Sequence, residues 1–439
     1  MKRTISVLLA FLLVMSMLLF ASCSSGEFGE KPEAENKDGY FSIRKSGSAV
    51  DLKKLVNKNE NDVNEKTVDE RFASSFYSFA SEMLKHSYKP GENTLVSPTS
   101  ALYALAMTAN GANADVQSDM LHVIADGLTM DELNAYLYNY SRSLMSGDGY
   151  TLSLADSVWF RNDGTLKVNE KFLEKVSSYY DADIFGVPYD ETTVKDINDW
   201  VSEKTDKMIK KIYDSPDDFS EMALTLINAV AFDAAFENTE YQYKNKKLDF
   251  VNSKGEKEKA DFFGYNEYLR YIKTDDETGF LKYYAGGKYA LAAFLPNDGV
   301  SIDDYVLSFD ASKTASLISS GSSERVELSM PEFKYDASFN MNDMLKTLGM
   351  ESAFNGGFEN MAVSEWGDIY IGRVFQKTHI EMMPTGTKAA AVTVVEMKNE
   401  CAPVFVEPFE ITLDRPFVYL ILDTENDLPL FIGVLNTTK

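Results

Sequence analysis

The chain has 439 residues, of which 44% are apolar and 13% aromatic. This composition supplies a large core and excludes a mainly disordered protein. The formal net charge of −25 argues against nucleic-acid binding, because phosphate backbones repel an acidic surface. The acidic residues are spread along the chain, which indicates solubility, with attraction of a cationic protein partner as the alternative.

Residues 1–22 have the pattern of an export signal. Lys2 and Arg3 precede an apolar run over 5–20, and Ala21-Ser22-Cys23 follows it. The run is shorter than the roughly 20 apolar residues that a membrane-spanning helix needs. We therefore expect an exported protein.

Cys23 is the expected lipidation site. Its placement resembles a bacterial lipoprotein box, although Phe20 stands where such boxes usually carry Leu. The resemblance implies cleavage before Cys23 and a lipid anchor at the cell surface, or otherwise an extracellular protein. Ordinary secretion with an unused cysteine is the alternative. If Cys23 carries lipid, Cys401, the other of the two cysteines, has no disulfide partner.

Residues 23–66 are polar and charged, which predicts a lipid-anchored flexible tether. Order is expected from about Val68, and residues 67–439 are predicted to form one domain. An amphipathic helix is predicted first, because Phe72, Phe76, Phe79, Ala80 and Met83 recur at helical spacing.

Later segments have the composition of strands. We expect them over 153–160, 223–232, 289–295 and 325–333, with a terminal hairpin of 417–422 and 429–435. The segment 223–230 is apolar at both alternating positions, which is typical of a strand covered on both faces.

The sequence contains no recognisable motif for catalysis or metal binding. His86, His122 and His379 have no metal-ligand spacing, and the sequence contains no nucleophile elbow or phosphate loop. The chain is therefore predicted not to be an enzyme, and no cofactor or metal is expected.

The segment 386–398 differs from its surroundings. Thr387, Ala389, Ala391, Thr393, Val395 and Met397 are uncharged, whereas the alternate positions carry every charge. This alternation describes a strand with one buried face, yet Pro384 and Gly386 before it and Pro403 after it indicate a loop. An ordinary half-buried strand is the alternative interpretation.

This segment resembles the reactive-loop hinge of the serpins, and further matches follow in family order. They are the segments 93–100, 105–112, 155–160, 197–201, 228–232, 414–417 and 430–433. The resemblance implies an α+β fold in which helices surround a large mixed β-sheet. It also implies smaller barrel-like sheets and an exposed, insertable reactive loop over about 384–409.

The resemblance implies suicide inhibition of an extracellular serine protease, possibly elastase-, chymotrypsin- or subtilisin-like, in a covalent complex. The protease cuts the loop, and the freed hinge inserts into the protein's own sheet. The small hinge residues allow this insertion, and four further residues lie at the sheet opening. The hinge consists of Gly386, Thr387, Ala389, Ala390, Ala391 and Thr393, and the opening of Ser97, Ser100, Asn228 and Gln376.

Three departures from the family pattern are present. Pro384 and Thr385 replace acidic residues before the hinge glycine, Gln376 replaces a histidine, and Phe236 replaces a tryptophan. The family's hinge-to-cleavage spacing predicts a reactive bond between Glu400 and Cys401. Because the segment before Pro416 is longer than usual, Val404 and Phe405 are the alternatives.

The remaining expectations concern partners. A monomer is expected, with contact to the membrane through the anchor only. The alternative functions are a non-inhibitory serpin acting as a binding or chaperone module, and a solute-binding lipoprotein.

Overall fold

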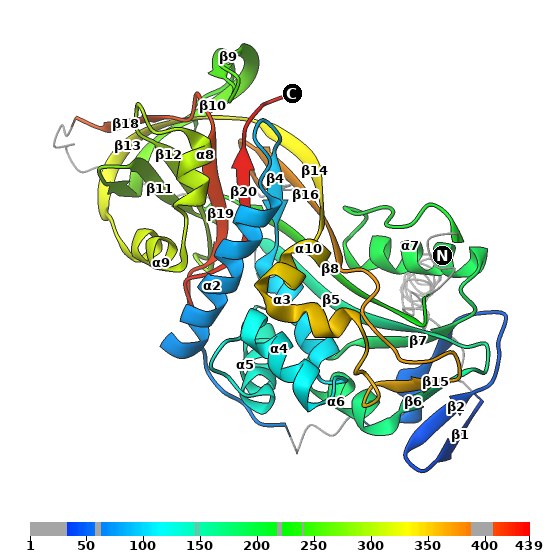
Figure 1. Ribbon diagram of the computed structural model, residues 1–439. Coiled ribbons are helices and arrows are strands. Elements are labelled where there is room, and N and C mark those ends of the chain that lie inside the picture. The colour runs from blue at the N-terminus through cyan, green and yellow to red at the C-terminus, as the bar shows by residue number, and fades with distance from the viewer. Residues whose placement is uncertain are drawn as a thin grey trace, which may run out of the picture.

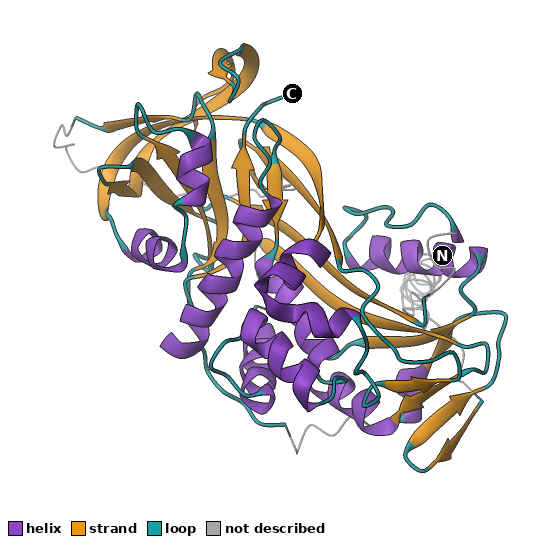
Figure 2. Cartoon of the chain, viewed as in Figure 1, coloured by secondary structure: helices purple, strands orange, loops and turns teal. Residues whose placement is uncertain are grey.

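The computed structural model describes residues 33–57, 63–144, 147, 149–216, 222–238, 241–387 and 407–439. Three β-sheets and a group of helices form the fold (Figures 1 and 2). The predicted α+β class is therefore confirmed. The expected export signal and Cys23 lie outside the described residues.

The main sheet has seven strands and is mixed, because β5 and β7 run parallel while the other neighbours are antiparallel. Its order is β14 (Phe333–Asn340), β16 (Phe375–Met383), β17 (Gly386–Thr387), β8 (Leu224–Ala235), β5 (Tyr150–Arg161), β7 (Asp183–Val187) and β3 (Val50–Asp51). The long strands β8 and β5 occupy its middle.

The second sheet has nine strands and contains the predicted C-terminal hairpin. Its order is β18 (Phe409–Thr412), β13 (Ser322–Pro331), β10 (Lys257–Lys273), β11 (Glu277–Tyr283), β12 (Tyr289–Pro296), β19 (Phe417–Asp423), β20 (Leu428–Leu435) and β4 (Thr94–Val96), with β9 (Tyr241–Val251) paired to β10. The barrel-like arrangement expected here is not closed, because β18 and β4 form two separate edges.

The helices gather mainly on one side of the main sheet (Figure 2). They are η1 (Leu52–Leu55), α2 (Glu70–Ser87), α3 (Pro98–Ala109), α4 (Ala114–Ile124), α5 (Met130–Ser143), α6 (Glu170–Tyr180), α7 (Glu191–Lys204), α8 (Ile302–Leu307), α9 (Ala311–Ser319), α10 (Asn342–Leu345), η4 (Lys346–Met350) and η5 (Glu351–Phe354). The predicted first helix is α2, and its apolar residues are buried. Within the described ranges, no helix is long and apolar enough to cross a bilayer.

Both faces of the main sheet are covered where β5 and β8 pair. Val158 and Phe160 of β5 join the main core, whereas Trp159 packs with Trp200 of α7 in a second core. On β8, Ile227 belongs to the second core in the same way. This two-sided burial explains the apolar run over 223–230 and confirms the prediction made from it.

Part of the predicted tether is folded. β1 (Ala34–Lys37) and β2 (Tyr40–Ile43) form a four-stranded sheet with β6 (Leu166–Asn169) and β15 (Ala362–Ser364), and β3 is an edge of the main sheet. Phe41, Ile43, Val50 and Leu52 are buried. The tether prediction was wrong for residues 33–57. A few apolar side chains at alternating positions are enough to fold this segment, because the exposed edge of a neighbouring strand supplies backbone hydrogen bonds.

Candidate functional site

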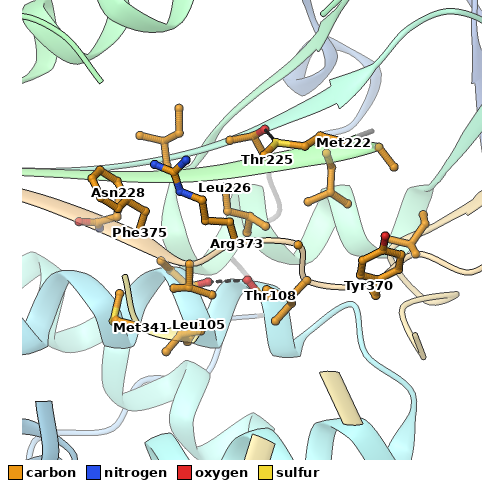
Figure 3. Close-up of a pocket in the computed structure, with 18 of the residues that line it drawn as sticks. Leu105, Thr108, Met222, Thr225, Leu226, Asn228, Met341, Tyr370, Arg373 and Phe375 are labelled. Atoms are coloured by element: carbon orange, nitrogen blue, oxygen red, sulfur yellow. Dashed lines mark hydrogen bonds between the residues drawn. The ribbon is translucent and has the colours of Figure 1, made fainter. Parts of the chain in front are cut away.

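The candidate site is the opening between β8 and β16 in the main sheet. The only described strand between them is β17, in which Thr387 pairs with Ala234 on one side and Met382 on the other. Beyond β17, a cavity of about 630 Å³ separates the two strands and reaches α3 (Figure 3). Among the described residues, β17 alone therefore lies between the two strands, at one end of this gap.

Gln376 joins β16 to the start of α3 across the opening. Its side-chain oxygen accepts from the backbone N–H of Ser97 at 2.8 Å, and its Nε2 donates to the carbonyl of Ser97 at 2.9 Å. Ser97 caps α3 and donates its hydroxyl to the carbonyl of Leu430 at 2.7 Å. The side-chain amide of Gln376 thus pairs with both the backbone N–H and the backbone carbonyl of the buried Ser97.

Ser100 joins α3 to the other side of the opening. Its hydroxyl hydrogen-bonds to Oδ1 of Asn228 on β8, and Nδ2 of Asn228 donates to Oδ1 of Asp156 on β5 at 2.6 Å. A polar chain therefore runs from β16 through α3 to β8 and β5. Opening or filling the gap must rearrange this chain, since it ties both bordering strands to the same helix.

The structure brings together all four residues predicted at the sheet opening. It adds Asp156, which the sequence reasoning did not select as a site residue. Asp156 is the one charged side chain in the segment 155–160, whose other residues are apolar or serine. A lone carboxylate in a strand covered on both faces was the signal that could have found it.

Burial raises the pKa of Asp156 to about 7, partly opposed by the hydrogen bond from Asn228. The folded state then holds a proton that the unfolded chain releases near its ordinary pKa of about 3.9. Between these values the folded state binds more protons, so the free energy of unfolding falls as pH rises. The loss approaches ~4 kcal/mol above the folded-state pKa.

We therefore expect Asp156→Asn to remove this pH dependence, because asparagine keeps the acceptor for Asn228 and does not titrate. The variant should match the wild type near pH ~4 and exceed its stability by up to ~4 kcal/mol at pH ~8. Urea unfolding across this pH range measures the difference. Parallel stability curves for the two proteins would contradict the raised pKa.

The first hinge residues lie inside the sheet. Gly386 has φ +143°, and a Cβ atom there would collide with the backbone oxygen of Ala234. Thr387 is 3% exposed, and its hydroxyl lies 2.5 Å from the hydroxyl of Tyr284. The backbone before them is held as well, since Thr385 accepts from the N–H of Phe236 at 2.9 Å.

This arrangement corrects the expected start of the exposed loop. Residues 384–387 form a turn and a strand, and β18 begins at Phe409 on the other side. The remaining predicted hinge residues Ala389, Ala390, Ala391 and Thr393 lie outside the described residues. So do Glu400, Cys401, Val404 and Phe405.

A strand that begins between β8 and β16 beside the residues of the sheet opening agrees with the sequence match. Residues 74–437 match the family described as "Serpin (serine protease inhibitor)". The chain belongs to the serpin family. As a serpin it is a member of a family of protease inhibitors. The shared fold explains why short segments along this sequence resemble serpin segments in the same order.

Similar proteins support this assignment. Iripin-1 of Ixodes ricinus is 30% identical over 363 residues, which cover 79% of this chain and 90% of Iripin-1. The crystal structure of the thermophilic serpin tengpin in its native state has a TM-score of 0.82 and 36% identity, and covers 89% of this chain and 100% of tengpin. The latent state of tengpin has a TM-score of 0.76 and 34% identity, over 85% and 100% of the two chains.

Three of the residues that depart from the serpin pattern make defined contacts in the structure. Phe236, in place of the usual tryptophan, stacks on Tyr284 with ring centres 4.9 Å apart and planes 11° apart. Pro384 lacks an acidic side chain, but its carbonyl accepts from the hydroxyl of Tyr265. Gln376 replaces the histidine with an amide that both donates and accepts.

A buried ion pair lies beneath the hinge of this serpin. The side chain of Lys282 on β11 is 2% exposed and pairs with Glu267 on β10. Its ammonium donates to the carbonyl of Asn238 at 3.1 Å and lies 3.8 Å from the ring centre of Tyr265 and 4.9 Å from that of Phe236. Tyr265 and Phe236 also donate hydrogen bonds to the carbonyls of Pro384 and Thr385, just before the hinge. The ion pair therefore packs against the residues that hold the start of β17.

We expect Lys282→Met to destabilise the protein by about 3–5 kcal/mol, because Glu267 is left unpaired and largely buried. Adding Glu267→Gln should restore most of that loss, since a neutral amide keeps a hydrogen bond with Asn238. Urea unfolding of both single variants and the double variant measures the coupling. Additive losses would show that the two side chains do not act as a pair.

Proposed function

We propose that this serpin inhibits a serine protease by inserting its cleaved loop between β8 and β16. The observation that carries the proposal is β17. Gly386 and Thr387 already pair with both bordering strands, so the segment after them enters the sheet in a register set in advance. The cavity beyond β17 supplies the space for that segment.

The register of β17 indicates what insertion would bring together. Continued antiparallel pairing from Met382 and Thr387 places residue 393 opposite Gln376 and residue 396 opposite Arg373. The inward positions of the inserted segment would then carry only uncharged residues, as the buried face requires. Among the outward positions, Glu396 would meet the cation of Arg373.

The chemistry belongs to the protease. Its serine oxygen attacks the carbonyl carbon of the scissile bond, the peptide C–N bond breaks, and the new amino terminus leaves with a proton. The loop remains attached to the protease as an acyl ester. Insertion then carries the ester and the protease across the molecule before water can hydrolyse the bond.

The scissile bond is proposed at Glu400–Cys401, with Val404 and Phe405 as the alternatives. A glutamyl-specific enzyme would fit the first site, and elastase-like or chymotrypsin-like enzymes would fit the others. The target is proposed to be extracellular, since the sequence begins with an export pattern.

The test is incubation of the purified chain with elastase-, chymotrypsin-, subtilisin- and glutamyl-specific enzymes. Denaturing gels are expected to show a covalent band of combined mass with at least one enzyme. Sequencing of the released C-terminal peptide then identifies the cut. Nicking without such a band by every enzyme would overturn inhibition and favour the non-inhibitory binding or chaperone module.

We also propose that the protein acts as an exported monomer anchored by a lipid on Cys23. The basic residues Lys2 and Arg3, the apolar run and the position of Cys23 support this. Cys23→Ser should move the protein from the membrane fraction to the soluble fraction of the export host. An unchanged membrane fraction would exclude anchoring through this cysteine.

A further inference from the structure

Apolar and polar side chains both line the cavity between β8 and β16, in nearly equal shares. The apolar part of the lining comes from α3, β8 and the segments beside them. It includes Leu105, Met222, Leu226 and Met341 (Figure 3), and also Ile209 and Ile212. Its volume of about 630 Å³ lies within the range of small-molecule sites. A molecule with an apolar body would therefore remove its surface from water here.

The guanidinium of Arg373 lies at this cavity. Arg373 extends from the segment before β16 toward β8 (Figure 3), and its guanidinium stacks over the ring of Phe375 at 4.4 Å. It makes no hydrogen bond or ion pair with any residue that the structure describes. Stacking uses the face of the guanidinium and leaves its in-plane N–H donors for a carboxylate.

The other two charged residues that line the cavity do not provide an equivalent cation for a bound anion. The ammonium of Lys377 donates to the carbonyl of Lys211 at 3.0 Å, and Asp368 is the one carboxylate among the lining residues. The chain as a whole carries a net charge of −25. A guanidinium that pairs with no residue of the described ranges therefore favours binding of an anion at this cavity, in spite of the negative charge of the protein.

The rim adds two exposed aromatic side chains. Trp366 is 58% exposed and Tyr370 is 53% exposed, and both line the cavity. Exposed large aromatic residues that gather at the entrance of a cavity are typical of a binding surface. The rim and the walls together fit a ligand with a flat or flexible apolar body.

We propose that this cavity binds a small apolar molecule that carries one carboxylate. The body would lie between α3 and β8, and the carboxylate would accept from Arg373. Such a ligand occupies the path of the inserting strand and takes the place that Glu396 would reach. It would therefore convert the inhibitor into a substrate, and this regulatory part rests on the proposed function.

The binding test uses the full chain and three probes of equal tail length: decanoate, decanol and decyltrimethylammonium. Calorimetry is expected to rank decanoate first. Arg373→Met should weaken decanoate binding roughly tenfold while changing decanol binding less than about twofold, since only the charged hydrogen bond is lost. The matched control is Arg325→Met, because Arg325 lies on β13 and not at the cavity.

A second readout locates the ligand. Trp366 is exposed at the rim, whereas Trp159 and Trp200 are buried in the second core. Decanoate should change tryptophan emission at the concentrations that saturate the calorimetric signal, and Trp366→Phe should abolish that change. Equal binding of the three probes, or binding unaffected by Arg373→Met, would overturn the site.

The regulatory part has its own measurement. With decanoate at saturation, the covalent band should weaken and the nicked product should increase, whereas Arg373→Met should resist this shift. Binding without any such shift would overturn the regulation and leave the site intact. If no covalent band forms even without ligand, the proposed function fails, while calorimetry still decides whether the site exists.

Discussion

Thr387→Arg is expected to turn the inhibitor into a substrate. The side chain of Thr387 is 3% exposed and contacts Tyr284 beneath the sheet. An arginine cannot occupy this position without leaving an unpaired charge in the core, which costs several kcal/mol. The arginine should therefore displace β17 from the sheet of the intact protein and remove the register that leads insertion. Insertion should then slow relative to hydrolysis, and the stoichiometry of inhibition should rise by about tenfold or more.

The matched control is Thr385→Arg, two residues earlier in the turn, where the side chain is only partly buried. It should retain inhibition. Thr387→Ser should do so as well, because it keeps the hydroxyl that meets Tyr284. Titration of the target protease gives the stoichiometry for each variant. Undiminished inhibition by Thr387→Arg, with a folded protein, would contradict insertion through this position.

Cleavage of the loop is expected to raise the melting temperature by more than ~10 °C. A new central strand would gain hydrogen bonds on both sides, each worth about 1 kcal/mol net, and would cover apolar surface along the opening. Differential scanning calorimetry of intact and loop-cut protein measures the change. The cut should be made by an enzyme that does not form the covalent complex.

Cut Thr387→Arg protein serves as the comparison. It should gain less than the cut wild type, because the same charge that hinders inhibition hinders insertion. If the cut wild type melts at the temperature of the intact protein, the segment does not enter the sheet. In that case the family assignment stands, and the inhibitory function does not.

Much of the fold could be predicted because the spacing of apolar residues in the sequence matches which side chains are buried in the structure. α2 follows from apolar residues at helical spacing, and β8 from an apolar run that is covered on both faces. The residues of the opening were found through the serpin resemblance, not through any local pattern. Ser97, Asn228 and Gln376 are separated widely in sequence, and only the packing of α3 beneath the sheet brings them together.

Other features depend on partners that a local pattern does not reveal. Residues 34–43 contain few apolar side chains, and they fold because β6 offers an edge for pairing. The burial of Lys282 depends on Glu267 and on two aromatic rings that are distant in the sequence. The sequence around Lys282 therefore did not indicate that this lysine lies in the core. The start of β17 depends on backbone hydrogen bonds from β8 and β16, which no side-chain pattern encodes.

The two-sided pairing of β17 also limits how the loop can change in length. Side chains in a strand alternate between faces, and here the phase is fixed at Thr387. Deleting a single residue just after Thr387 would exchange the two faces of the inserted segment and turn Glu396 and Lys398 toward the core. Substitutions near the proposed cleavage site should therefore leave this phase unchanged, whereas a single-residue insertion or deletion near the hinge should prevent insertion.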